Sequence, residues 1–352
     1  PSSFQTVFFG DTQVRNRKEV AYLAHDILEW IIGRGRDFSF GCTLGDIVFD
    51  DLSVYDALLP TMAQAGITWY NVKGNHDSNY DGAPNQRLTD ETFERVFGPS
   101  YYSFNYGRVH FIVLNDVYWG DGGGYKGKLD EDQMEFLKND IRLVPSDRLV
   151  VVLTHIPLDE IENRQDVYRI LESRRQVLAI AGHTHTQEHR FIDESAGWKG
   201  RNSLHVFICG TACGCWWGGT PDELGIPHAT MGDGVPNGYA VVSFVGSSYS
   251  ITFVPARRPL DYQMDISVPD DVTISEASKT VVTANIFNGS SRSSVEMNID
   301  GGEWVPMKQS GSHMWQANLP SGIEAGTHTI AVRTTDMFGK VYTGRRIFRV
   351  VP

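Results

Sequence analysis

The chain lacks the features of a membrane-spanning or nucleic-acid-binding protein. No apolar run approaches the roughly 20 residues that a helix needs to cross a bilayer. Acidic residues outnumber basic ones by 43 to 31, and the net charge of −12 disfavours nonspecific binding to nucleic acid, which depends on Lys and Arg. No low-complexity tract or fixed-period repeat occurs. We therefore expect no transmembrane segment in this chain and no nucleic-acid partner.

Cysteine is also scarce, with four residues in 352. Cys42 lies in an apolar stretch and is expected to pack as a small apolar residue. Cys209, Cys213 and Cys215 form a cluster in which we expect buried thiols, with one internal disulfide as the alternative. Cysteine usage therefore leaves the redox compartment open.

The remaining composition is that of an ordinary globular chain, with 41% hydrophobic and 21% charged residues. Its length is sufficient for two domains. The chain begins at Pro1, shortly before the first expected strand, so we expect any signal peptide or anchor to lie outside it.

Polar side chains suited to metal binding follow several short apolar runs. Gly74-Asn75-His76-Asp77 comes after residues 67–72, and Gly182-His183-Thr184-His185 comes after residues 177–181. Asp, Asn and His supply oxygen and imidazole ligands for divalent ions. Because ligands in an open α/β sheet gather at the carboxyl ends of the strands, we expect these residues to converge. Three more runs have the same arrangement: 6–9 before Asp11-Thr12-Gln13, 38–42 before Gly45-Asp46, and 149–154 before His155.

In this order, the blocks resemble those of the calcineurin-like metallophosphoesterases. The family pattern is Asp-x-His, Gly-Asp, Gly-Asn-His-(Asp/Glu), a lone His and Gly-His-x-His, and the resemblance covers roughly residues 5–255. One position departs from the pattern, since Gln13 stands where most members have His. The resemblance implies an enzyme that hydrolyses phosphoric ester bonds.

It also implies two divalent metal ions, for which Mn, Zn and Fe(II) are the candidates. A metal-bound hydroxide would attack the phosphorus atom, and Asp46 would bridge the two ions. The first ion would bind Asp11, Asp46 and His185, with Gln13 as a weak fourth ligand; the second would bind Asp46, Asn75, His155 and His183.

His76 takes the family position of a residue that is not a ligand. It would face the leaving-group oxygen and either donate a proton or stabilise the developing charge. A carboxylate on its other ring nitrogen would fix its tautomer. Many members have an Asp three residues after the bridging one, but Phe49 stands there in this chain, which leaves Asp50 and Asp51 as the candidates.

Gln13 has consequences for the metals. An amide oxygen is a poorer donor than imidazole, so we expect the first ion to bind more weakly than the second. We also expect no tyrosinate–Fe(III) centre, and an intense visible charge-transfer band in the purified protein would contradict this.

The fold class expected for the chain is α/β (α+β), with a domain of residues 1–258 and a second domain of residues 259–352. Helical periodicity occurs at residues 18–32, 54–65 and 130–143, with Ser53 and Asp130 as candidate N-caps, and residues 101–106 and 108–114 resemble a β-hairpin. The family resemblance implies a four-layer αββα sandwich for this first domain. Later strands without helical periodicity predict a β-sandwich of immunoglobulin or fibronectin shape: 280–286, 294–299, 314–318, 328–335 and 343–350.

Two loops rich in glycine and aromatic residues, 115–125 and 213–239, are expected to frame the site. Trp216 or Trp217 would stack on a sugar or a base, and the alternative is that these rings seal the loops onto the core or onto the second domain. Arg15, Arg87 and His189 are candidates for holding a phosphate oxygen, with a solvated surface position as the alternative.

The leading interpretation is a metal-dependent phosphoesterase acting on a small-molecule or surface-linked phosphate ester. Gly-Asn-His-Asp favours a phosphodiesterase over a phosphomonoesterase. The alternative is a metal-containing binding module that docks a glycan or cell-surface partner without turnover, and it gives no reason for a non-ligand His76. The domain combination suits a bacterial periplasm or cell envelope.

Overall fold

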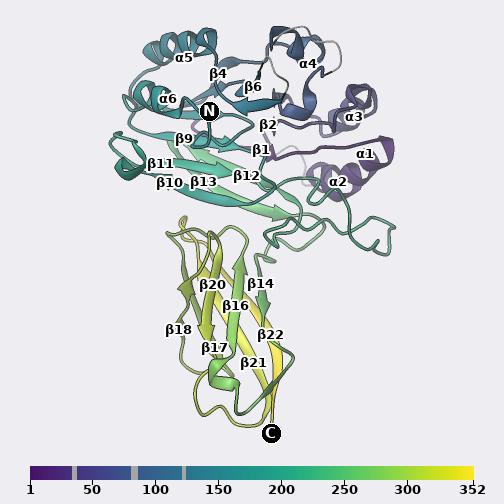
Figure 1. The fold of residues 1–352 in the computed structure, drawn as a ribbon, viewed down its shortest axis with the longest axis vertical. Coiled ribbons are helices and arrows are strands. Elements are labelled where there is room, and N and C mark those ends of the chain that lie inside the picture. Colours follow the sequence, from purple (N-terminus) through teal and green to yellow (C-terminus); the bar gives the residue numbers. More distant parts are fainter. Residues whose placement is uncertain (34–37, 81–85, 121–123) are drawn as a thin grey trace. The chain divides into compact units, whose positions relative to one another are not determined.

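The computed structural model describes residues 1–33, 38–80, 86–120 and 124–352. Contacts between residues divide the chain into two compact units, Pro1–Arg257 and Arg258–Pro352. The first unit carries all of the metal-binding blocks, and its segments in Figure 1 run from purple to green.

Two β-sheets form the centre of the first unit. One has the strand order β13-β12-β1-β2-β3, with β13, β12 and β1 antiparallel to one another in turn and β1, β2 and β3 parallel. The other has the order β10-β11-β9-β8-β5-β4, with antiparallel pairs at its two edges and parallel pairs inside. The bounds are β1 Ser3–Phe9, β2 Phe40–Leu44, β3 Trp69–Val72, β4 Tyr102–Tyr106, β5 Val109–Val113, β8 Leu149–Leu153, β9 Val177–Ala181, β10 Glu188–Ile192, β11 Leu204–Ile208, β12 Gly238–Val245 and β13 Ser248–Pro255. A separate hairpin consists of β6 Val117–Trp119 and β7 Tyr125–Gly127.

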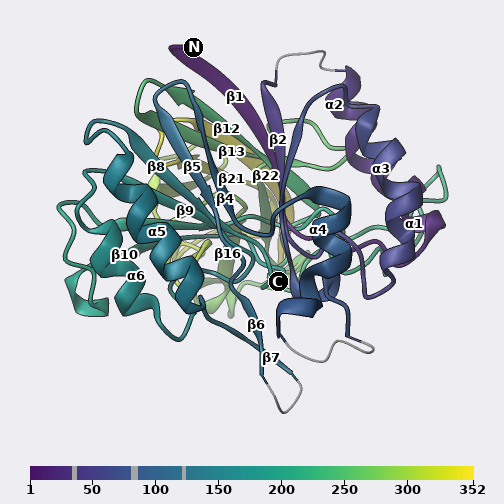
Figure 2. The same cartoon turned by 90° about the horizontal axis from the view of Figure 1, so that it is seen from above.

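Helices cover the outer face of each sheet, which completes the four layers of the αββα sandwich (Figure 2). One apolar core joins the first sheet to the helices of the amino-terminal part, and another joins the second sheet to α5 and α6. The helices are α1 Arg17–Leu23, α2 Glu29–Gly33, α3 Tyr55–Ala63, α4 Glu91–Phe97, α5 Glu131–Leu143 and α6 Arg164–Leu171.

Aromatic side chains fill the space between the two sheets. Phe4, on β1, points away from the helical face, because side chains alternate along a strand and Val7 and Phe9 belong to the helical core. Phe111 of β5 reaches the first sheet, with ring centroids 5.4 Å from Phe40 and 5.6 Å from Phe244. This dry contact holds the two sheets together, so the strand ends of both sheets can contribute to one site.

The helix predicted over residues 18–32 occurs as α1, a π-helical turn at Ala24–Leu28, and α2. Asp130 caps α5 as predicted, because its side chain accepts a hydrogen bond from the backbone N of Gln133 at 2.9 Å. The prediction for Ser53 was wrong. The cap at this point is Asp51, which accepts from both the backbone N and the hydroxyl of Ser53 and starts the 3-10 turn Leu52–Val54 before α3.

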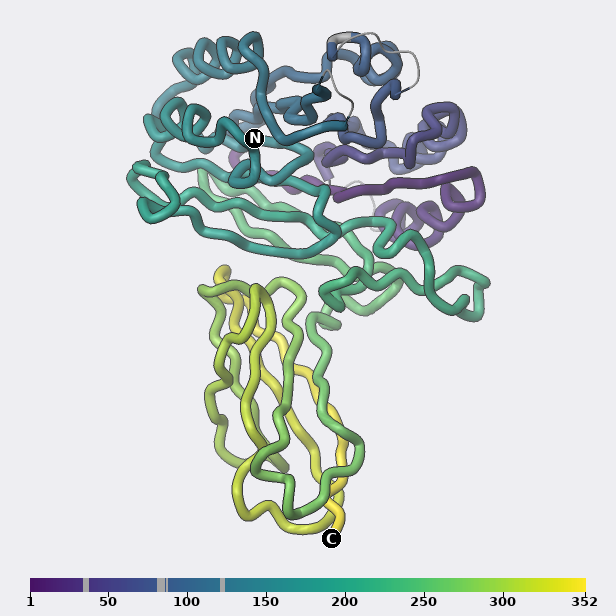
Figure 3. The backbone as a smooth tube through the Cα atoms, viewed as in Figure 1, coloured from purple at the N-terminus to yellow at the C-terminus, as the bar shows by residue number. Residues whose placement is uncertain are grey.

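The second unit is a sandwich of two β-sheets, traced at its carboxyl end in yellow in Figure 3. The sheet orders are β14-β16-β20-β19 and β15-β22-β21-β17-β18, around a core that includes Trp315, Phe348 and Val332. The fold therefore has the all-β character that its strand pattern predicted. The bounds are β14 Met264–Ser267, β15 Asp271–Thr273, β16 Val281–Ile286, β17 Ser294–Ile299, β18 Val305–Pro306, β19 Lys308–Gln309, β20 Met314–Asn318, β21 Gly326–Thr335 and β22 Val341–Val351.

Among the described residues, no helix is both long enough and apolar enough to cross a membrane.

Candidate metal centre

The candidate ligands lie just beyond the carboxyl ends of five strands. Asp11 and Gln13 follow β1, Asp46 follows β2, Asn75 follows β3, His155 follows β8, and His183 and His185 follow β9. The ends of these strands are held level by register, since Leu44 pairs with Val72 and Leu153 pairs with Ile180. The two sheets therefore deliver their ligands to the same place.

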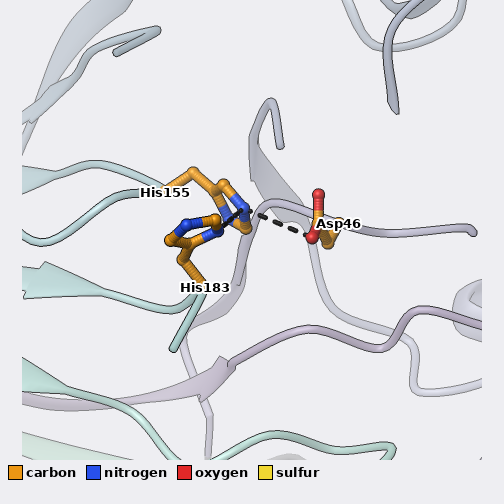
Figure 4. Close-up of side chains that lie close together, drawn as sticks. All are labelled: Asp46, His155 and His183. Atoms are coloured by element: carbon orange, nitrogen blue, oxygen red, sulfur yellow. Dashed lines mark hydrogen bonds and ion pairs between the residues drawn. The ribbon is translucent and has the colours of Figure 1, made fainter. Parts of the chain in front are cut away.

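Asp46, His155 and His183 point toward one another, as Figure 4 shows. One ligand atom from each lies within 4.8 Å of the others. His155 Nε2 is 3.3 Å from Asp46 Oδ2, 3.0 Å from Asn75 Oδ1 and 3.0 Å from His183 Nδ1. This cluster contains the four ligands expected for the second ion.

The tautomer of His155 explains why these contacts suit a cation. Its Nδ1 lies 2.8 Å from the carbonyl oxygen of Leu44, which fixes the proton on that nitrogen. In the neutral form of the ring, Nε2 would present a lone pair toward the same place as three other electron-rich atoms. A single proton cannot satisfy all of these contacts, whereas a divalent cation could bind all four atoms, so the donor set fits a metal.

Asp11 gives a second sign of a cation. Its Oδ2 accepts a hydrogen bond from the backbone N of His183 at 2.8 Å, but its buried Oδ1 has no hydrogen-bond partner among the described residues. His185 Nε2 lies 4.0 Å from that Oδ1, while its Nδ1 is held 3.0 Å from the carbonyl oxygen of Gly214. A buried carboxylate oxygen without a partner is rare in proteins and fits the place of an ion.

The electrostatics of the cluster favour positive charge. Burial raises the pKa of Asp11 to about 6, because the charged carboxylate is costly away from water. Burial also disfavours the charged form of His155, but the carboxylates of Asp46 and Asp11 outweigh it and raise the pKa of His155 to about 10. Burial and the charge of His155 lower the pKa of His183 to about 3. A bound cation would provide the positive charge that these buried carboxylates require.

The backbone at the ligands is strained and closely packed. Asp11, Gln13, Asp46, His183 and His185 all have positive φ angles, between 25° and 73°. Such angles are unusual for residues other than glycine and cluster at functional sites. Gly74 is required for a different reason: a Cβ there would lie 2.0 Å from the backbone N of Asp46.

Asp77 holds two of the ligand loops together. Its buried carboxylate accepts hydrogen bonds from the backbone N of Ile47 at 3.0 Å, the backbone N of Gly74 at 2.9 Å and the hydroxyl of Tyr55 at 2.8 Å. The residue thus fixes the loops that carry Asp46 and Asn75. The sequence interpretation gave it no role, and its place in the Gly-Asn-His-Asp run is the signal that was available.

His76 lies beside this cluster with one nitrogen occupied by a carboxylate. Nδ1 is 2.7 Å from Asp50 Oδ1, Nε2 is 3.9 Å from Asp46 Oδ2, and the ring stacks on Phe49 with centroids 4.4 Å apart. Of the two candidate partners, the structure therefore brings Asp50 to His76, whereas the side chain of Asp51 caps the following turn.

Comparison with known proteins adds a family to this geometry. The family model described as "Calcineurin-like phosphoesterase" matches residues 4–187, which is more than half of the chain. The chain belongs to the calcineurin-like phosphoesterase family. It is therefore a metal-dependent hydrolase of phosphate esters. A second model, "C terminal of Calcineurin-like phosphoesterase", matches residues 207–312.

Two solved structures are similar to this chain at low sequence identity. "Structure of PhoD" has 9% identity and a TM-score of 0.47, and the match covers 99% of this chain and 72% of that one. The purple acid phosphatase PPD1 from yellow lupin (Lupinus luteus) seeds has 12% identity and a TM-score of 0.45, with 99% and 55% covered. The search of curated proteins gave no match.

Gln13 is buried in the phosphoesterase site, and its amide has a defined orientation. The indole Nε1 of Trp216 donates to Gln13 Oε1 at 2.6 Å, and Gln13 Nε2 donates to Asp46 Oδ2 at 3.2 Å. An indole nitrogen can only donate, so the amide oxygen is the atom that faces Trp216. The NH2 group of Gln13, not its oxygen, therefore faces the Asp46 carboxylate.

The other candidate substrate contacts divide between the site and the surrounding structure. Trp216 packs on His185, with ring centroids 4.7 Å apart, and Arg15 donates to the carbonyl oxygen of Trp216 at 2.9 Å. Trp217 is buried and donates to Asp26 Oδ2 at 2.6 Å, which supports the sealing role rather than stacking on substrate. His189 Nδ1 lies 2.9 Å from Nε2 of His205 on the neighbouring strand. The side chain of Arg87 and residues 121–123 of the loop 115–125 lie outside the described residues.

The cysteines in the structure are free thiols, with Cys42, Cys209 and Cys213 buried and Cys215 exposed. The buried positions of Cys42, Cys209 and Cys213 match the expectation of buried thiols, whereas Cys215 is exposed.

Proposed function

We propose that the chain hydrolyses a phosphodiester or phosphomonoester at a dinuclear site, with His76 assisting the leaving group. Asp11, Asp46 and His185 would hold the first divalent ion, and Asp46, Asn75, His155 and His183 the second. When bound, such ions neutralise phosphate charge and lower the pKa of a coordinated water. Mn, Zn and Fe(II) remain the candidates.

The observation that carries the proposal is the pairing of His76 with Asp50. Because Nδ1 is engaged by the Asp50 carboxylate at 2.7 Å, Nε2 is the nitrogen available to a substrate. The backbone N of His76 also donates to Asp46 Oδ1 at 2.8 Å, which fixes the residue beside the bridging carboxylate. A protonated Nε2 at this place can give its proton to a departing alcohol oxygen.

Hydrolysis of an aryl phosphate monoester and of the matching bis-aryl diester tests the proposal. Wild type and His76→Ala would be assayed after chelation and restoration of Mn, Zn or Fe(II). We expect metal-dependent turnover that falls by about 10²-fold or more in the variant, the usual scale of acid–base assistance. The ratio of the two rates would test the favoured diesterase branch.

The adjacent carboxylates of Asp50 and Asp51 provide a test variant and its matched control. Asp50→Asn removes the charge that orients His76 and should reduce kcat, whereas Asp51→Asn changes only the cap before α3 and should leave turnover unchanged. Equal effects of the two substitutions would contradict the assigned role of Asp50. Metal binding without turnover of any ester would favour a binding module that docks a glycan or a cell-surface partner.

For the whole protein, we propose a catalytic domain of residues 1–258 and a positioning domain of residues 259–352 in a bacterial periplasm or cell envelope. The substrate would be a small-molecule or surface-linked phosphate ester, and the net charge of −12 argues against a nucleic acid. Fractionation of the source cells tests the location, and a purely cytosolic signal would reject it.

A further inference from the structure

Three aromatic rings form a continuous row that leads away from the metal ligand His183. Tyr125 meets His183 edge-on with centroids 5.9 Å apart, Trp119 lies 5.4 Å from Tyr125, and Tyr80 lies 4.7 Å from Trp119. These three residues, Tyr80, Trp119 and Tyr125, are called the aromatic row below. They come from two segments, the hairpin β6–β7 and the end of the Gly-Asn-His-Asp loop.

The register of the hairpin places two of the rings on one face. Trp119 pairs directly with Tyr125, and Tyr118 pairs with Lys126. Because paired residues in an antiparallel ladder share a face and successive residues alternate, Trp119 and Tyr125 lie on the face toward His183, and Tyr118 lies on the opposite face. The sequence alone could not reveal this pairing, since it depends on the register across the loop.

The aromatic row is anchored to the metal-binding loop. The indole of Trp119 donates to Ser78 Oγ at 3.0 Å, and the hydroxyl of Tyr80 donates to the carbonyl oxygen of the candidate ligand Asn75. Gln86 joins the hairpin to the same region by donating to the carbonyl oxygen of Val117 at 3.3 Å. These contacts set the rings in place before any ligand binds, which lowers the entropic cost of stacking.

The rings also remain accessible. Tyr80 and Tyr125 are each 39% exposed. Burial raises the pKa of the Tyr125 phenol, and the negative charges of Asp46 and Asp11 raise it further. A ring at this position can contact the organic part of an ester whose phosphate lies on the ions.

We propose that the aromatic row binds the alcohol part of the substrate through the face of a ring, either a nucleoside base or a sugar. This inference rests on the proposed phosphoesterase function and names the substrate class of the same site. Exposed aromatic faces recognise flat or apolar ring surfaces by stacking. Ringless alcohols such as glycerol would gain nothing from the row.

The test compares adenosine monophosphate, glucose phosphate and glycerol phosphate as substrates of the metal-loaded chain. Wild type should prefer one of the two ring-bearing esters, and the preferred ester identifies the base or the sugar. Tyr125→Ala should lower kcat/KM for that ester by about 5- to 150-fold, mainly through KM, since this is the usual scale of stacking on an aromatic side chain. Glycerol phosphate should be unaffected.

Two variants separate stacking from disruption of the hairpin. Tyr125→Phe keeps the ring and should retain the preference, and Tyr118→Ala truncates the opposite face of the same strand pair and should leave all three rates unchanged. Equal use of the three esters by wild type, or an equal loss for all three in Tyr125→Ala, would overturn the proposal.

A binding measurement distinguishes failure of the aromatic-row proposal from failure of the proposed phosphoesterase function. Free adenosine and glucose would be titrated calorimetrically into the chain without any phosphate ester. Binding of one of them that is lost in Tyr125→Ala would support the aromatic row even if no ester were hydrolysed. If the chain hydrolyses the three esters equally well and binds neither adenosine nor glucose, the phosphoesterase proposal stands and the proposed role of the aromatic row is refuted.

Discussion

Replacing Gln13 by histidine should tighten the binding of the first ion. In the structure the amide presents its NH2 group to Asp46, while its oxygen accepts the indole hydrogen of Trp216. An NH2 group cannot coordinate a cation, so Gln13 in this orientation leaves the ion with the carboxylates of Asp11 and Asp46 and the imidazole of His185. A histidine at position 13 would add an imidazole lone pair.

The magnitude follows from the two hydrogen bonds of the amide. To coordinate the ion, the Gln13 amide would have to rotate so that its oxygen takes the place of its NH2 group. This rotation would lose the hydrogen bond to Trp216, worth about 1 kcal/mol, and the hydrogen bond to the Asp46 carboxylate, worth about 1.5–3 kcal/mol. The sum of about 2.5–4 kcal/mol corresponds to roughly 60- to 700-fold in affinity. Gln13→His avoids this cost, so we expect at least about tenfold tighter binding of the first ion.

Substitution of Trp216 provides the sharper test. Its effect on metal affinity has opposite signs for the two possible states of Gln13, in which the amide oxygen either is or is not already a ligand. Trp216→Phe removes the indole donor and should tighten the first ion by about fivefold, since turning the amide then costs about 1 kcal/mol less. If the Gln13 oxygen were already a ligand oriented by Trp216, the same substitution would weaken binding. Trp217→Phe is the matched control, because that indole donates to Asp26.

Affinities would be measured for Mn²⁺ by competition with a chelator. Anomalous scattering from crystals equilibrated at graded Mn²⁺ concentrations would assign each affinity to a site. Weaker binding of the first ion in Trp216→Phe, with no change in Trp217→Phe, would refute the reasoning. The same titration of wild type checks whether the first ion binds more weakly than the second.

Two other predictions concern hydrogen bonds outside the metal cluster. Tyr55→Phe removes the 2.8 Å bond to the buried Asp77 carboxylate and should reduce the free energy of unfolding by about 1.5–3 kcal/mol; an unchanged denaturant midpoint of the first unit would contradict this. In the second unit, the hydrogen bond to Asp300 raises the pKa of His328 above its ordinary value of 6.5. Its stabilising effect should therefore be full below pH 6.5 and disappear as the pH rises through the raised pKa. NMR titration should show the raised pKa in wild type and its return toward 6.5 in Asp300→Asn.

Much of the fold could be predicted because apolar runs and their periods mark strands and helices directly. The strands 294–299 and 314–318 occur with the predicted bounds, and the hairpin of β4 and β5 was indicated by two short runs on either side of Gly107. The candidate ligands could be recognised as a group because each one follows such a strand. These features depend on local sequence, which is why they were accessible.

Contacts between distant segments could not be predicted in the same way. The choice between Asp50 and Asp51 depends on a left-handed backbone at Asp50, with φ of 63°, and on the capping bond made by Asp51. The orientation of Gln13 depends on Trp216, which is 203 positions away in the chain. Local patterns carry no information on either contact.

At the candidate ligands, the positive φ angles lower the stability of the fold, whereas the side chains at the same positions are needed for the chemistry. Asp11, Asp46, His183 and His185 each hold a backbone conformation that glycine would adopt at lower cost. Glycine at any of these positions would relax the backbone and remove a side-chain atom that would coordinate the metal ion. Selection of variants for heat resistance alone should therefore favour substitutions that dismantle the centre, so directed evolution of this scaffold needs a metal-binding screen alongside the thermal one.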